Sequence, residues 1–123
     1  LKTFRMENGE LSRQPVAQGT TKFSGVGATP TVSANSLESG VVWVVATHNF
    51  FTKDGPATLH AYEAANVSHE LYNSEQNSER DRAGTALRFA MPLVADGHVY
   101  IGLKKEVDVY GLNLATHGDH QPK

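Results

Sequence analysis

The segment "TLHAYEAANVSHELYNS", residues 58–74, decides the fold class of this chain. Apolar and polar side chains alternate over its first part, the turn-forming stretch "EAANVS" follows, and "HELYNS" alternates again. A period of two residues is typical of β-strands, and Asn and Ser favour turns. The segment therefore predicts two neighbouring antiparallel strands.

The pattern around this segment recurs along the chain. "TPTVSANS" at 29–36 resembles "MPLVADGH" at 91–98, with Pro and Val aligned, and an apolar strand follows each, "GVVWVVATH" or "HVYIGLKKE". A shorter strand that ends in Tyr62 or Tyr110 comes next, and "LKTFR" at 1–5 repeats it. Tandem units of short strands predict an all-β fold of four-stranded antiparallel sheets. A β-sandwich with accidental internal similarity is the alternative.

Bulk composition limits the function classes. The chain has 123 residues, 39% hydrophobic and 20% charged, which indicates one globular domain. A net charge of −2 argues against a nucleic-acid partner, and no apolar run approaches the roughly 18 residues of a membrane span. The chain has no cysteine, so it forms no disulfide. It begins with Leu1, and we expect it to be a piece of a longer chain.

Residues 58–74 resemble, in degenerate form, the motif Ala-x-Asp-x-x-Thr-Gly-Lys-x-x-Trp. This is the tryptophan-docking motif of pyrroloquinoline-quinone-type (quinoprotein-alcohol-dehydrogenase-like) β-propellers. Ala61 matches the Ala of the motif, Glu63 stands at its Asp, residues 66–68 at its Thr-Gly turn, and Tyr72 near its Trp. "RDRAG", "MPLVADGHVYIG" and "VDVYGL" are similar to the closing blades of bacterial members.

This resemblance implies an incomplete β-propeller of about two to two and a half blades, taken from the C-terminal portion of a larger one. The implied boundaries are 1–18 for the end of one blade, 28–74 for a full blade, 91–112 for three strands of the last blade, and 113–123 for a polar tail. The expected partners are the remaining blades, or other copies joined through open sheet edges. The resemblance also implies a bacterial protein in the periplasm or outside the cell.

A rigid scaffold or binding module without an assigned activity is the predicted function. The alternatives are part of a pyrroloquinoline-quinone-dependent dehydrogenase, with the quinone and calcium in a central channel, or part of a propeller hydrolase or lyase. The departures from the docking motif favour a blade without quinone. No catalytic, cofactor or metal residue is assigned, because the sequence shows no phosphate loop, nucleophile elbow or His-Glu-x-x-His.

Two loops carry candidate binding residues. His48, Phe50 and Phe51 belong to "HNFFTKDGP", and loops on rigid scaffolds often bind ligands. The favoured interpretation is that both phenylalanines pack over the sheet. Arg80 or Arg82 of "SERDRAG" could clamp an anion, but a solvated or ion-paired charge run is favoured.

The remaining candidates have ordinary structural interpretations. His117, Asp119 and His120 form a weak zinc candidate in the polar tail. Residues 66–68 fit the glycosylation sequon, but a simple turn is preferred.

Two residues inside strands are predicted to pack. Trp43 lies in "VVWVV", a strand apolar on both faces, and is expected in the core. His60 alternates with Leu59 and Ala61, so we expect it to pack or to face an edge.

Overall fold

The structure is a computed structural model that describes residues 1–23 and 27–112, except for the side chain of Phe50. Strands dominate the described residues, which confirms the all-β class. The described helical segments are two short turns, η1 (His48–Phe51) and α1 (Ser78–Asp81). The strands are β1 (Lys2–Thr3), β2 (Met6–Glu7), β3 (Glu10–Leu11), β4 (Ala17–Gln18), β5 (Thr31–Ser33), β6 (Val41–Ala46), β7 (Thr58–Glu63), β8 (Asn66–Asn73), β9 (Leu93–Ala95), β10 (His98–Leu103) and β11 (Glu106–Tyr110).

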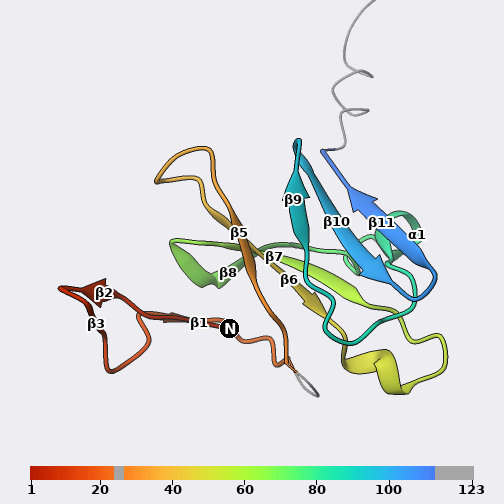
Figure 1. The fold of residues 1–123 in the computed structure, drawn as a ribbon, viewed down its shortest axis with the longest axis horizontal. Coiled ribbons are helices and arrows are strands. Elements are labelled where there is room, and N and C mark those ends of the chain that lie inside the picture. Colours follow the sequence, from red (N-terminus) through yellow and green to blue (C-terminus); the bar gives the residue numbers. More distant parts are fainter. Residues whose placement is uncertain (24–26, 113–123) are drawn as a thin grey trace, which may run out of the picture.

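The strands form two larger and two smaller antiparallel sheets. Strands β5, β6, β7 and β8 form a four-stranded sheet, and β9, β10 and β11 form a three-stranded sheet in the same sequential order. Strand β1 pairs with β4, and β2 pairs with β3. Figure 1 shows the three-stranded sheet on one side of the four-stranded sheet and the N-terminal strands towards the other.

The two larger sheets share one pairing register, which turns the sequence repeat into a structural repeat. Val42 of β6 pairs with Val32 of β5, and Val99 of β10 pairs with Val94 of β9. The two partners, Val32 and Val94, are the valines that align in the sequence. Positions of β5, β6 and β7 can therefore be matched to positions of β9, β10 and β11.

The third strands continue this register. Tyr62 of β7 pairs with Val42, and Tyr110 of β11 pairs with Val99. The repeated aromatic residue therefore has the same place in both sheets. The residues that follow β11 in the three-stranded sheet, 113–123, lie outside the described part of the chain.

The N-terminal strands match the third and fourth strands of the four-stranded sheet. The Gly19 N–H donates to the carbonyl of Leu1 at 3.0 Å, as the Ser74 N–H donates to the carbonyl of Leu59 at 2.9 Å. The four-stranded sheet therefore shares its pairing of third and fourth strands with the N-terminal strands, and its pairing of first to third strands with the three-stranded sheet. The hairpin β2–β3 is an extra element between β1 and β4.

Both faces of the four-stranded sheet are covered, because alternate residues of β6 and β7 enter two different cores. One core lies against the three-stranded sheet and contains Val45, Ala57, Leu59, Ala83, Ala86, Val99, Ile101 and Leu103. The other contains Val42, Val44, Tyr62 and Val67, and the N-terminal segment packs on it. Trp43 is half-buried against the first core, and its Nε1 donates to Ser33 Oγ at 2.8 Å. The predicted packing of this strand on both sides is confirmed.

Candidate functional site

Two aromatic rings and a carboxylate enclose His60 on β7. Its Nδ1 lies 2.5 Å from Glu70 Oε1. The ring stacks on Tyr62 with centroids 6.0 Å apart, and it meets the edge of Phe23 at 5.5 Å. The alternation of β7 turns His60 and Tyr62 to the same face. His60 is buried there, so its predicted packing is confirmed.

The hydroxyl of Tyr62 is the unusual polar group of this cluster. Its oxygen is buried and makes no hydrogen bond of good geometry among the described residues, although the side chains of Thr21 and Glu70 lie beside it. Burial raises the pKa of Tyr62 above its ordinary value. An unpaired buried hydroxyl destabilises the folded chain, so this position is a weak point in an otherwise well-packed face.

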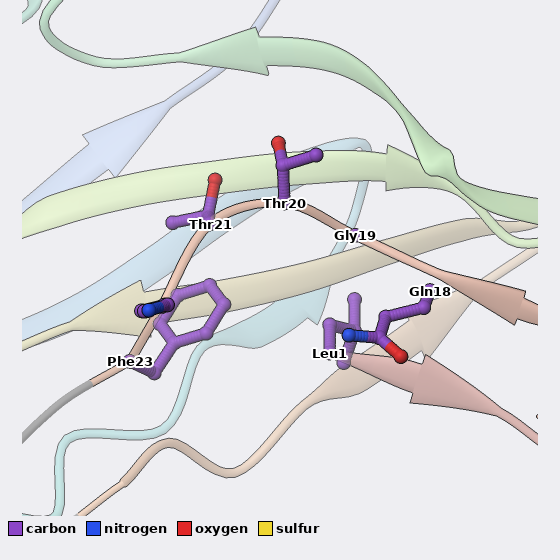
Figure 2. A pocket seen from close by; sticks show the side chains of 7 residues that line it. Leu1, Gln18, Gly19, Thr20, Thr21 and Phe23 are labelled. Atoms are coloured by element: carbon purple, nitrogen blue, oxygen red, sulfur yellow. The ribbon is translucent and has the colours of Figure 1, made fainter.

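An open groove of about 590 Å³ lies along the N-terminal segment near this cluster, lined by Leu1, Gln18, Gly19, Thr20, Thr21, Lys22 and Phe23. Figure 2 shows the side chains of Phe23 and Leu1 on one side of this segment, and Thr20 and Thr21 on the other. All lining residues come from the N-terminal segment, and the groove is wide open. Small-molecule sites enclose most of their ligand, so this groove is a poor candidate for a small-molecule site.

A second polar cluster joins the four-stranded sheet to the three-stranded sheet. Arg80 forms a bidentate pair with Asp81, with distances of 2.5 and 2.7 Å, and this pair holds the pKa of Asp81 below its ordinary value. Tyr110 Oη donates to the Asp81 carbonyl at 2.9 Å. Burial, aided by the charge of Asp108, raises the pKa of Tyr110 to about 12. This network fixes the segment that connects the two sheets.

Arg80 and Arg82, the candidates for an anion clamp, both form ion pairs within the chain. The guanidinium of Arg80 is paired with Asp81, and that of Arg82 lies 2.9 Å from Glu75 Oε2. Both arginines therefore pair with carboxylates of nearby residues, which favours the structural interpretation of this charge run.

The prediction for the loop after β6 can be checked at Phe51, because the side chain of Phe50 lies outside the described residues. The side chain of Phe51 is 77% exposed, so the expectation that it packs over the sheet was wrong. The loop is held instead by Asn49, whose Nδ2 donates to the Pro56 carbonyl at 3.2 Å. Gly55 packs so closely that an added Cβ would lie 2.5 Å from the Asn49 carbonyl oxygen. His48 is exposed.

The positions that resemble the docking motif contact their own sheet and α1. Glu63 Oε2 lies 3.0 Å from His69 Nδ1. The Asn66 side chain accepts bonds from the N–H and hydroxyl of Ser68, as in a simple turn. Burial and a hydrogen bond with Asp81 raise the pKa of Tyr72.

Metal-ligating side chains do not cluster in the described part of the chain. Calcium takes six or more oxygen ligands, yet among residues 1–23 and 27–112 no three His, Asp or Glu side chains are placed to hold a metal ion. His117, Asp119 and His120 lie outside the described residues. No helix in the described part is long and apolar enough to cross a membrane.

A smaller pocket of about 190 Å³ contains residues that the sequence did not single out. Its lining consists of Gly27, Ala28, Thr29, Thr47, Phe89 and Ala90. Two of these segments lead into β5 and β9, and Thr47 follows β6. The repeat could have found them, because the alignment of Pro30 with Pro92 also places Gly27 opposite Phe89.

Comparisons with protein-family models, with curated proteins and with solved structures find no match to this chain.

Proposed function

We propose that this chain is a segment of a β-propeller-like stack that works as a rigid scaffold and binding module, with its successive sheets as blades. The observation that carries the proposal is the common pairing register of the two larger sheets, in which Val42 and Tyr62 correspond to Val99 and Tyr110. In a β-sandwich with accidental sequence similarity, we would not expect residues that align in the sequence also to pair with equivalent residues on the neighbouring strands.

The direction of stacking supports the same conclusion. The face of the three-stranded sheet that carries Val99 and Ile101 corresponds to the Val42 face of the other sheet. It packs on the opposite face of that sheet, against Val45 and Leu59. Different faces therefore meet at the interface, as they do when units repeat in one direction around a ring.

The outer face of the three-stranded sheet is the next docking surface in this scheme. It carries Leu93, Tyr100, Gly102, Val107 and Val109, and three of these are large apolar residues that are more than half exposed. The corresponding face of the four-stranded sheet is covered by the three-stranded sheet. We assign this outer face to one occupant, the Val42-type face of a further sheet of the same repeat.

A scaffold of this kind has a stable stack of sheets and variable loops that contact partners. The described residues offer no support for quinone or calcium binding, and no observation favours a hydrolase or lyase. The proposed function is therefore binding by the loops of a rigid stack.

Sedimentation of the purified chain tests the docking face. We expect association that increases with concentration in the micromolar range, because an apolar sheet face seeks a partner. Changing both Val107 and Val109 to Lys should shift the chain to monomer. Leu37→Lys is the matched control, since Leu37 is 105% exposed in a loop and should leave association unchanged.

Circular dichroism should show that all three chains remain folded as β-sheet. A wild-type chain that stays monomeric at every concentration would overturn the docking face and with it the stacked scaffold. Association that persists in the double variant would also overturn the assigned face.

A further inference from the structure

The turn that leads into the first strand of each unit has a left-handed backbone in both larger sheets. Gly27 has a φ of +79° and Phe89 a φ of +62°. Each residue is followed by Ala, one variable residue and Pro, so the two turns are equivalent by sequence as well. Glycine adopts this conformation freely, whereas a bulky side chain is strained there. Phe89 therefore occupies a left-handed position at which the equivalent turn of the other sheet has glycine.

Core packing does not explain the aromatic side chain at this position. Phe89 is 78% exposed. The Arg88 guanidinium carbon lies 5.9 Å from the centroid of its ring. A strained position with an exposed aromatic ring points to a role in binding, because local strain is concentrated at functional sites.

The pocket beside Phe89 is built from the two equivalent turns. Its lining comes from Gly27, Ala28 and Thr29 of one turn, Phe89 and Ala90 of the other, and Thr47. The hydroxyl of Thr31 donates to the Pro92 carbonyl at 2.7 Å, and this bond holds the two lead-in segments together. The pocket is thus attached to the rigid part of the stack.

The size of the pocket selects a small ligand. Its volume of about 190 Å³ equals that of roughly six water molecules in the liquid. Sites for drug-sized molecules begin at about 300 Å³. One six-membered ring fits this space.

The lining selects the chemistry of that ring. Phe89, Ala28 and Ala90 offer apolar surface, Thr29 and Thr47 offer hydroxyls that can donate and accept, and none of the lining side chains is charged. We propose that this pocket binds one pyranose ring of an uncharged carbohydrate, with the ring face on Phe89 and its hydroxyls towards Thr29 and Thr47. A purely apolar ring would desolvate the threonine hydroxyls without replacing their hydrogen bonds.

This inference deepens the proposed binding role by naming a ligand class, and it rests on that role. The test is NMR titration of the labelled chain with methyl β-glucopyranoside, methyl β-galactopyranoside and methyl α-mannopyranoside. At least one should shift the amides of Ala28, Thr47 and Ala90, with an affinity on the order of millimolar for so small a ligand.

Phe89→Gly separates binding from folding. The variant restores the residue found at the equivalent turn, so its melting temperature should stay the same or rise. Its affinity for the sugar should fall about tenfold or more, since the aromatic platform is lost. Phe51→Gly is the matched control, because Phe51 is equally exposed but does not line the pocket, and it should bind as the parent does.

Three results would overturn the sugar site. These are no amide shift with any of the three glycosides, equal affinity in Phe89→Gly, or tighter binding of phenylalanine amide than of any glycoside. The last result would assign the pocket to an aromatic side chain. These outcomes differ from failure of the scaffold, which the sedimentation test reports independently of any sugar.

Discussion

The two larger sheets have the same register but differ in what covers one of their faces. On that face the four-stranded sheet carries Leu59 and Ala61, which are 0% and 2% exposed. Val107 and Val109 stand at the corresponding positions of the three-stranded sheet and are 63% and 53% exposed. Similar side chains at equivalent positions should therefore contribute very differently to the stability of the fold, because their burial depends on the neighbouring sheet and not on the strand itself.

The largest difference is expected between Leu59→Ala and Val107→Ala. Leu59 is fully buried, so its truncation removes apolar contacts and leaves a cavity, with a loss of about 2–5 kcal/mol in the free energy of unfolding. Val107→Ala should change that free energy by no more than about 0.5 kcal/mol, as exposed substitutions usually do. Urea denaturation followed by circular dichroism measures both, at a concentration where the chain is monomeric.

Equal losses at the two positions would contradict the comparison. They would mean that the outer face of the three-stranded sheet is covered even in the isolated chain.

A smaller difference is expected between Trp43 and Tyr100, which occupy equivalent positions on β6 and β10. Trp43→Ala should cost about 2–3 kcal/mol, below the 3–5 kcal/mol of a fully buried aromatic residue, because Trp43 is only half-buried. Tyr100 is also partly buried, but its face has no covering sheet, so Tyr100→Ala should cost less, about 1 kcal/mol. Thermal denaturation compares the two, and a larger loss at Tyr100 would reverse the assignment of the covered face.

Much of the fold followed from period and repeat alone. The strands around Val42 and Tyr62 were predictable because β-branched and aromatic residues alternate between clear turn signals. The hairpin β2–β3 was not predicted, since "MENGEL" is short and exposed and its Asn-Gly turn carries no apolar pattern beside it. A short exposed hairpin has no buried face, so its sequence carries no alternation of apolar and polar residues.

The candidate site was less predictable, because its residues meet only through tertiary structure. Glu70 could not be assigned to His60 from spacing, since a bulge in β8 shifts the register near Tyr62. Phe51 was expected to pack, but the tight contact between Gly55 and Asn49 shapes the loop. Phe89 could have been noticed, because its partner in the repeat is Gly27.

The two equivalent tyrosines provide a finer test of the comparison. Tyr110 donates a hydrogen bond to the Asp81 carbonyl, whereas the buried hydroxyl of Tyr62 makes no hydrogen bond of good geometry among the described residues, with Thr21 and Glu70 beside it. Tyr110→Phe should therefore cost about 1 kcal/mol. Tyr62→Phe should be neutral or stabilising, because it removes a buried polar group that is not satisfied. A clear loss of stability in Tyr62→Phe would show that its hydroxyl does find a partner.

The smallest expected effect is the acid sensitivity of the segment that joins the two sheets. The Arg80 guanidinium lowers the folded-state pKa of Asp81 below its usual value of 3.8, so the unfolded chain binds the proton more readily. The stabilisation is therefore present above about pH 4 and is lost as the pH falls through the lower, folded-state pKa. Asp81→Asn should flatten the dependence of the urea midpoint on pH below about pH 4, whereas Glu79→Gln, an exposed change on the same helix, should keep the parent slope. Asp81→Asn should leave the hydrogen bond from Tyr110 unchanged, because Tyr110 donates to the Asp81 main-chain carbonyl and not to its carboxylate. Identical acid profiles for Asp81→Asn and the parent would show that the ion pair does not stabilise the junction between the sheets.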